Sequence, residues 1–378
     1  MTHPVLGPRA LNRALLERQL LLTPSASLTA LEVVEWLVGM QSQAPGAPYL
    51  GLWTRLEDFS FTELETLMTE RQVVRMVLMR GTVHLVGAED ALRLRPLMQP
   101  MLDRSFRRTP FARRVGEVER GEMVAVAREL LGREPLGPAE LRRELGARWP
   151  EADPGALVHA LRLWAPLVQV VPRGLWSRGG GPRYATVEDW LGRPMESGSV
   201  GAALDAVVPR YLAAFGPATV ADVQKWCGLT GLREVLDRLR PGLRSFRDEN
   251  GRELYDVPGA PLPDPATPVP ARLVADFDNL LLSHADRARV LDDAYRTRVM
   301  GVNGLVRGTI LVDGFVGGIW GIERTGKGDR ASATLTVTPF VPLSAEDGEA
   351  LEAQGARLLM ASDPGAATRA VRIGPPAP

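Results

Sequence analysis

The chain has 378 residues and equal numbers of acidic and basic side chains, 45 of each, so its formal net charge at pH 7 is zero. This balance argues against an evenly basic nucleic-acid-binding surface and leaves local basic patches as candidates. No apolar run approaches the roughly 20 residues that a membrane-spanning helix needs, and residues 1–18 lack a signal-peptide pattern. We therefore expect a cytoplasmic protein of several domains that has no membrane partner.

Reactive side chains are scarce. Cys227 is the only cysteine and the four histidines are dispersed, so we expect no internal disulfide, no metal site and no cofactor. Lys225 and Lys327 are the only lysines; the other 43 basic residues are arginines. The planar guanidinium suits phosphate contact, although a coding bias across a genome explains the same excess.

The first predicted unit, residues 1–115, has the element order helix, helix, helix, hairpin that is typical of a winged helix. Leucines form one helical face in residues 8–22, and residues 28–40 repeat the pattern. A third helix is expected from Ser60, where a capping box is available. Residues 73–79 and 82–86 are rich in branched side chains and are expected to pair as strands.

A helix over residues 88–108 leads to two further stretches with the same order. The second unit, residues 116–195, has helical patterns at 117–131, 138–148 and 154–164 and strands at 167–171 and 183–187. The loop between these strands is basic and glycine-rich, which is typical of a pliable wing or of an ordinary solvated hairpin tip. The third unit, residues 196–260, has helices at 200–215, 219–226 and 232–239 and a hairpin within 243–257.

The pattern changes after a proline-rich linker at residues 261–270. Strands at 305–312, 315–323 and 332–338 predict a small antiparallel β-barrel within residues 271–362, closed by a helix over 344–360. Residues 363–378 are expected to be a loosely held tail. The predicted fold class is therefore α+β, with three tandem winged-helix units followed by a small antiparallel β-barrel domain.

Two glutamines flank one small residue directly after the second predicted helix. In an extended backbone, Gln41 and Gln43 point to the same side. Each carboxamide offers one acceptor oxygen and two donor hydrogens and stays neutral at ordinary pH, so the pair could hold a water molecule against a substrate. The alternative is that both side chains cap the helix or satisfy buried backbone groups.

The segment from Leu37 to Pro45, followed by residues 49–56, resembles the Gln-X-Gln signature of the AlkZ-like DNA glycosylases. These are bacterial winged-helix proteins that excise alkylated bases and unhook interstrand crosslinks. Residues 79–86, 211–219 and 276–284 fit the family in the same order, so the resemblance spans most of the chain. It implies that Gln41 and Gln43 are the catalytic pair. A related branch has an acid where Gln43 stands, so this chain is similar to the glutamine type.

Several other residues are candidates for DNA contact. Arg80, Thr82 and His84 alternate along a predicted strand, so one face should carry all three, and the resemblance places that face near the glutamines. A hydrogen-bonded structural role is an equal alternative for His84. Candidates for phosphate contact are the arginines of the densest basic run and of the wing-like loop: Arg104, Arg107, Arg108, Arg113, Arg114, Arg173 and Arg178. A solvated linker or loop explains them as well.

The polar clusters at residues 276–279 and 283–287 look at first like a catalytic triad or acid pair. There is no Gly-X-Ser-X-Gly elbow in the chain, and short polar clusters at the start of a domain commonly form caps and turns. We therefore assign these clusters to the fold rather than to catalysis.

Together these observations predict a monofunctional DNA glycosylase. An alkylated purine already carries a positive charge and departs neutral, so two amides that position a water could suffice for hydrolysis. No catalytic amine is evident, so we expect no strand scission. The expected partner is double-stranded DNA that carries alkylated bases or crosslinks, and the expected state is a monomer. The alternatives are a non-catalytic winged-helix DNA-binding regulator and a hydrolase of free nucleosides.

Overall fold

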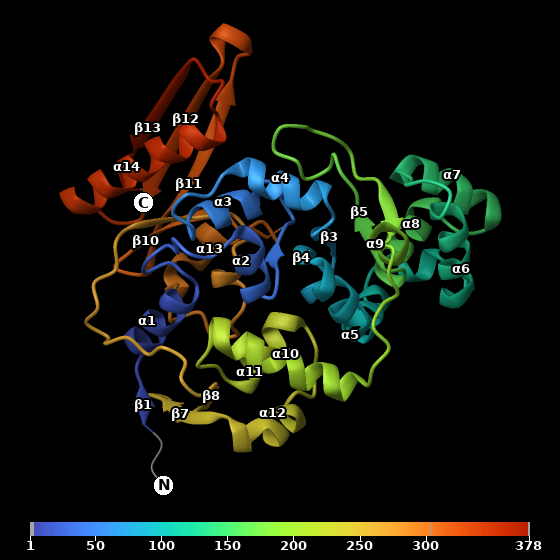
Figure 1. The fold of residues 1–378 in the computed structure, drawn as a ribbon, viewed down its shortest axis with the longest axis horizontal. Helices are drawn as coiled ribbons and strands as arrows, with labels where there is room; N and C mark the ends of the chain where they lie inside the picture. The colour runs from blue at the N-terminus through green and yellow to red at the C-terminus, as the bar shows by residue number, and fades with distance from the viewer. Residues whose placement is uncertain (1–3, 303, 377–378) are drawn as a thin grey trace.

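The structure, a computed structural model, describes residues 4–302 and 304–376. Figure 1 shows α6 and α7 at one end of the molecule and α14 with β13 toward the other. The helices are α1 (Pro8–Arg18), α2 (Ala30–Trp36), α3 (Ala47–Trp53), α4 (Phe61–Thr69), α5 (Ala88–Arg107), α6 (Arg120–Leu131), α7 (Pro138–Arg148), α8 (Pro154–Trp164), α9 (Val187–Leu191), α10 (Val200–Phe215), α11 (Val220–Cys227), α12 (Arg233–Leu239), α13 (Arg296–Val299) and α14 (Ala345–Ser362). The strands are β1 (Val5–Leu6), β2 (Met40–Gln41), β3 (Val73–Val77), β4 (Val83–Gly87), β5 (Leu167–Gln169), β6 (Tyr184–Thr186), β7 (Arg244–Asp248), β8 (Glu253–Asp256), β9 (Arg272–Val274), β10 (Gly308–Val312), β11 (Phe315–Thr325), β12 (Ser332–Pro339) and β13 (Thr368–Ile373).

The mixed α+β class is confirmed. The order of helix, helix, helix and hairpin occurs in the second and third stretches, whereas in the first stretch β2 and α3 lie between α2 and α4 before the hairpin. The division into three winged-helix units remains a prediction, because sheets and core cross the proposed boundaries. A central five-stranded sheet has the order β2-β4-β3-β5-β6 and joins the first hairpin to the second. A smaller sheet pairs β1, near the start of the chain, in parallel with β7 of the third stretch. One hydrophobic core cluster extends through all three stretches and into the C-terminal part.

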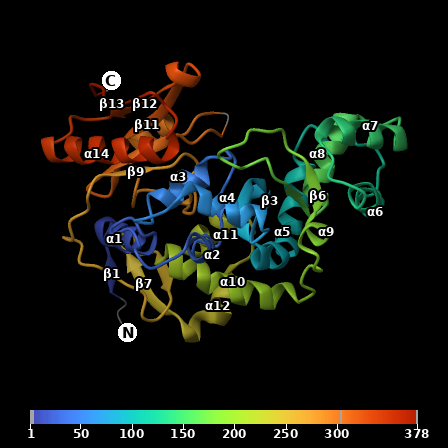
Figure 2. The same ribbon diagram turned by 45° about the horizontal axis from the view of Figure 1, so that its top comes forward.

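The C-terminal strands form an open sheet with the order β13-β12-β11-β10-β9, so the expected barrel is wrong. The two edge strands, β9 and β13, lie at opposite sides of the sheet and do not pair. Figures 1 and 2 show α14 lying across one face of this sheet. Leu351, Leu358 and Leu359 of α14 belong to the same core cluster as Leu335 and Val337 of β12. The helix therefore buries the apolar face that closure into a barrel would have buried.

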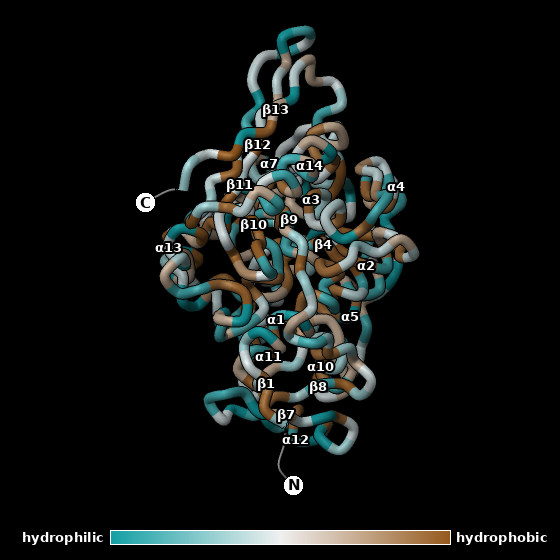
Figure 3. The backbone as a smooth tube through the Cα atoms, turned by 90° about the vertical axis from the view of Figure 1, so that its left-hand side faces the viewer, coloured by the Kyte–Doolittle hydropathy of each residue, from teal (hydrophilic) through white to brown (hydrophobic). Residues whose placement is uncertain are grey.

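The expectation of a loosely held tail is also wrong for the residues of β13. This strand pairs in parallel with β12 over six residue pairs. The hairpin between β11 and β12 projects from the body of the molecule (Figures 1 and 2), and its tip is hydrophilic (Figure 3). None of the described helices is both long and apolar enough to cross a membrane.

Two segments expected to be loops are held by specific contacts. Along the proline-rich linker, Arg13 donates to the Thr267 carbonyl at 2.9 Å and Arg18 donates to the Pro261 carbonyl at 3.0 Å. The wing-like loop between β5 and β6 places Trp176 against the ring of Tyr49, with ring centroids 5.4 Å apart. The part of this loop near Trp176 is therefore packed on α3 and α4 rather than extended into solvent.

Candidate active site around Gln41

The segment that carries the glutamines leaves α2 through a sharp turn and then pairs with β4. Val38 and Gly39 have φ values of +52° and +92°. A Cβ on Gly39 would lie 2.4 Å from the Val86 side chain, so only glycine lets the backbone pass this close. The chain then forms β2, in which Gln41 is paired with His84 of β4. The pairing of β2 with β4 places Gln41 in a buried position.

Arg80 fixes the orientation of the Gln41 carboxamide. Its Nη2 atom donates to Gln41 Oε1 at 2.7 Å, and its Nη1 atom donates to the Trp226 carbonyl at 2.5 Å. A guanidinium has only donors, so the amide end that faces Arg80 must be the oxygen. The amide nitrogen of Gln41 has no hydrogen-bond partner among the described residues. Burial lowers the pKa of Arg80 to about 10, so the group remains cationic at neutral pH.

Gln43 lies two residues further and is exposed. Its Oε1 atom accepts a hydrogen bond from the backbone N–H of Val83 at 3.3 Å. Between the glutamines, Arg75 donates to both the hydroxyl and the carbonyl of Ser42 at 2.9 Å. Both carboxamide oxygens thus face protein donors, and both amide nitrogens remain available to donate.

Arg80, Thr82 and His84 do not alternate along one strand, so that prediction is wrong. Arg80 has φ +58° within the 3₁₀ turn η1 (Met79–Gly81), and β4 begins only at Val83. Thr82 instead donates through its hydroxyl to the Met79 carbonyl at 3.2 Å. The left-handed residue turns the guanidinium of Arg80 toward Gln41.

His84 has the contacts of a structural histidine. Its Nδ1 atom lies 3.0 Å from the Thr82 carbonyl, so Nδ1 carries the proton and donates it. Its Nε2 atom then accepts from Arg80 Nη2 at 3.3 Å. Burial, and next the charge of Arg80, lower the pKa of His84 to about 3. The ring is therefore neutral at physiological pH and helps to hold Arg80.

The polar segment at residues 276–279, which sequence reasoning assigned to the fold, reaches this site. Asn279 donates to the Gly39 carbonyl at 2.9 Å and accepts from Arg80 at 3.3 Å. Asp278 accepts two hydrogen bonds from Arg55, at 2.8 and 2.9 Å. The fit of residues 276–284 to the family pattern was the available signal for Asn279, but its proximity to Gln41 depends on its hydrogen bond to Gly39, 240 positions earlier in the chain.

A small cavity of about 10 Å³ lies where these segments meet. Its lining includes Gln41, Arg55, Asp276, Asp278 and Asn279. Apolar side chains complete the wall. A water molecule needs about 10 to 15 Å³ of such space, so the cavity has room for at most about one water molecule beside Gln41. Gln43, Arg80 and His84 are not part of the lining.

The predicted basic run at the end of α5 lies apart from this cavity. Arg107, Arg108 and Arg113 are exposed, and none has a partner among the described residues. Arg104 donates to a backbone carbonyl just after α11 at 3.2 Å, and Arg114 pairs with a carboxylate just before α8 at 2.7 Å. Three of the five side chains are thus uncommitted and could contact phosphates.

In the wing-like loop, Arg173 donates to the Gly180 carbonyl at 3.0 Å, whereas Arg178 is exposed. Neither side chain lines the cavity beside Gln41. Within the described part of the chain, no three His, Cys, Asp or Glu side chains converge as metal ligands would.

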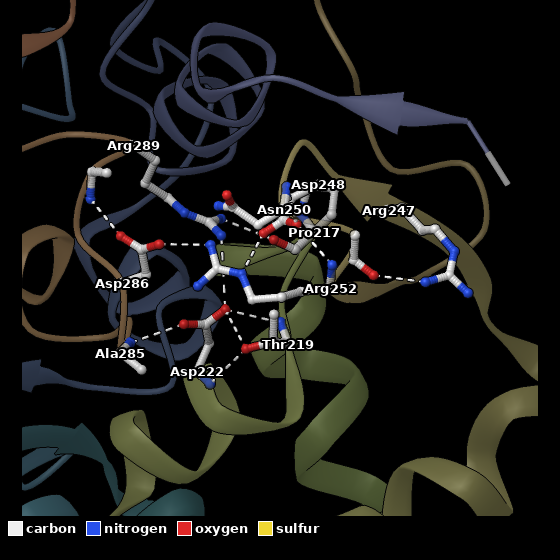
Figure 4. Close-up of polar contacts among 12 residues, drawn as sticks. Pro217, Thr219, Asp222, Arg247, Asp248, Asn250, Arg252, Ala285, Asp286 and Arg289 are labelled. Atoms are coloured by element: carbon white, nitrogen blue, oxygen red, sulfur yellow. Dashed lines mark hydrogen bonds and ion pairs between the residues drawn. The ribbon is translucent and has the colours of Figure 1, made fainter.

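A second cavity, of about 70 Å³, lies at the junction of β7, β8 and α11, among the polar contacts drawn in Figure 4. Arg252 pairs with Asp248 at 2.5 Å and with Asp286 at 2.6 Å. Arg289 lies 3.7 Å from Asp222. Each of these charges is matched by an opposite one, so we assign this cluster to the packing of the third stretch against the C-terminal part.

Comparison with known proteins places the chain among DNA repair enzymes. The family model for DNA glycosylase AlkZ-like proteins matches residues 34–361. An interstrand DNA cross-link repair glycosylase from Streptomyces sahachiroi is 25% identical over 380 residues, covering 92% of this chain and 94% of the relative. The solved structure of the DNA glycosylase AlkZ from the same organism matches with a TM-score of 0.80 and 22% identity, over 98% of this chain and 100% of that one. With the family model matched over most of its length, the chain belongs to the AlkZ-like DNA glycosylase family.

Proposed function

We propose that this protein is a monofunctional DNA glycosylase that hydrolyses the N-glycosidic bond of cationic alkylated purines, such as N7-alkylguanine and N3-alkyladenine. The observation that carries this proposal is the placement of Gln41, which lines a small cavity with its amide nitrogen free. Gln41 and Gln43 can donate to a water oxygen and position that water for attack on deoxyribose C1′. Neither glutamine supplies a proton.

The chemistry of the leaving group fits this site. When the bond from C1′ to a cationic purine breaks, its electron pair neutralises the base, so no proton donor is needed. A neutral base such as uracil departs as an anion and needs an acid or a strong anion stabiliser. His84 cannot be that acid near neutrality, because its pKa is lowered to about 3.

The test is a panel of duplexes that differ in one base. We expect release of N7-methylguanine and N3-methyladenine, measured as alkali-labile abasic sites, and no release of uracil or hypoxanthine. A barrier several kcal/mol higher slows a reaction by several decades, since each decade corresponds to about 1.4 kcal/mol. Efficient uracil release would overturn the proposal. Binding to every duplex without base release would favour the non-catalytic DNA-binding alternative, and release from free nucleosides would favour the nucleoside hydrolase.

The same assay follows the product strand. Lys327 lies in the projecting β11–β12 hairpin, and Lys225 is exposed on α11. Burial, and next the charges of Arg287 and Arg80, lower the pKa of Lys225. Neither lysine lines the cavity beside Gln41, so we expect an intact abasic strand and no adduct with borohydride. An adduct lost in Lys225→Arg would contradict a purely hydrolytic reaction.

The name of the Streptomyces relative adds interstrand crosslinks to the proposed substrates. A crosslink through purine N7 leaves each joined base cationic, so breaking one N-glycosidic bond releases that strand by the same chemistry. Denaturing electrophoresis of a duplex crosslinked through N7 would show unhooking as the return of single strands.

A further inference from the structure

The two glutamines leave one requirement of hydrolysis unmet. The attacking water must lose a proton as its oxygen bonds to C1′. A carboxamide is too weak a base to take that proton, and the oxygen of Gln41 is already bound to the cationic Arg80. The oxygen of Gln43 faces a backbone N–H. A proton acceptor must therefore come from another side chain of the cavity.

Asp276 is the side chain that remains. Two aspartates line the cavity with Gln41. Asp278 is bound in two places by Arg55, and both side chains are almost fully buried. Asp276 forms no hydrogen bond or ion pair with another described residue; its carboxylate accepts only from its own backbone N–H.

We propose that Asp276 is the general base of this site, accepting a proton from a water molecule that Gln41 holds in the cavity they both line. The assignment rests on the glycosylase function proposed for the chain and adds a carboxylate to a site that the sequence presents as glutamine-only. In the same position, a carboxylate also stabilises the positive charge that develops on the sugar.

The step balances in atoms and electrons. The water oxygen bonds to C1′, the bond from C1′ to the purine nitrogen breaks, and its electron pair neutralises the cationic ring. One water proton moves to Asp276 and later to solvent, and the other remains on the new hydroxyl of the abasic sugar. The step needs no oxidant or reductant, because the electron pair of the broken bond stays with the base.

The surroundings adapt Asp276 to this role. Burial, and next the charge of Asp278, raise the pKa of Asp276 to about 6. The other charged group in the lining is Arg55, which is engaged by Asp278, and Arg80 lies behind Gln41. The Asp276 carboxylate is therefore ionised at neutral pH and more basic than an ordinary aspartate, which suits a general base.

The neighbouring residue holds this geometry. Phe277 has φ +56°, a conformation that is uncommon for a bulky side chain. Its backbone N–H donates to the Val306 carbonyl at 3.2 Å. Asp276 and Asp278 thus flank a left-handed residue in the connection that follows β9.

The experiment measures single-turnover release of N7-methylguanine from duplex DNA between pH 5 and 8.5. For the wild-type protein we expect the rate to rise about tenfold per pH unit below pH 6 and to level off above it. Asp276→Asn preserves shape and removes the base, so we expect a rate about 10² to 10⁴ lower at pH 7.5 and no inflection near pH 6. Duplex affinity by fluorescence anisotropy should be unchanged.

Asp205→Asn is the matched control, because Asp205 is a partly exposed aspartate that pairs with Arg238 on the surface. It should keep the wild-type rate and profile. An Asp276→Asn protein with the wild-type rate would overturn the assignment, and so would a slow variant that keeps the wild-type inflection, since that loss would be structural. A wild-type protein that releases no alkylated base would instead overturn the proposed function, and the assignment with it.

Discussion

Residues with strained backbones cluster around Gln41. Six non-glycine residues in the described ranges have a positive φ, and three of them, Val38, Arg80 and Phe277, border this site. Such conformations cost on the order of 1 to 3 kcal/mol each and persist where the surrounding structure enforces them. Here Val38 turns the chain so that β2 can pair with β4, Arg80 directs its guanidinium toward Gln41, and Phe277 shapes the segment that carries Asp276. The strain is consistent with a site whose geometry matters more than its local stability.

At this scale, Gln41→Ala and Gln43→Ala should each lower the rate of base release by about 10² to 10³, the usual effect of removing one positioning or electrostatic donor. DNA affinity should change little, because a neutral amide adds no bulk charge attraction. Gln72→Ala is a matched control, since Gln72 is exposed and its side chain is hydrogen-bonded only to Glu70 among the described residues. Gln43→Asp should retain measurable activity, as the acid-bearing branch of the family implies. Wild-type rates in both alanine variants would remove the glutamines from the mechanism.

Among the elements, α7, α8 and α10 begin and end at the residues that the sequence predicts. Their signals are local. Pro138 and Pro154 occupy the first turn of α7 and α8, and the apolar spacing marks the buried face. Local signals fail where an element depends on a distant partner. Strand β13 forms because it pairs with β12 and packs against α14. No pattern within residues 368–373 predicts this parallel pairing.

The candidate site also has residues that local sequence signals identify and residues that depend on distant parts of the chain. The pair Gln41 and Gln43 is visible in the sequence because two like residues flank one position. Asn279 and Asp276 are visible only as members of a polar cluster, and their meeting with Gln41 requires β2, η1 and the segment after β9 to be assembled. Arg80 was expected on a strand, and only its left-handed φ brings it to Gln41.

The end of α5 carries the next prediction. Arg107 and Arg108 are exposed without partners, so Arg107→Ala combined with Arg108→Ala should weaken binding to all duplexes alike. Each lost phosphate contact should lower the slope of log affinity against log salt by about 0.9. The matched control is Arg133→Ala combined with Arg143→Ala, which removes the same charge from arginines already paired with Glu129 and Glu144. Equal slopes in the two double variants would show that the end of α5 is a solvated surface.

Across the whole molecule, buried ion pairs tie the proposed domains together. Arg18 of α1 and Asp256 of β8 are both fully buried and meet through two hydrogen bonds, at 2.7 and 2.9 Å. Arg55 and Asp278 link the first stretch to the C-terminal part in the same way. Together with the parallel pairing of β1 and β7, these contacts predict that the chain unfolds as one cooperative unit rather than domain by domain.

Asp256→Asn tests this cooperativity. The variant leaves the Arg18 guanidinium buried without its counter-charge, and removing one partner of a buried pair typically costs about 3 to 5 kcal/mol. Differential scanning calorimetry should therefore show a single transition that moves to lower temperature as a whole. Asp205→Asn, which loses only an exposed pair with Arg238, should melt close to the wild-type protein. Two separate transitions, with only one of them shifted by Asp256→Asn, would contradict this prediction. They would show that the stretches joined by Arg18 and Asp256 are independent domains. The continuity of sheet and core across their boundaries would then contribute little to their stability.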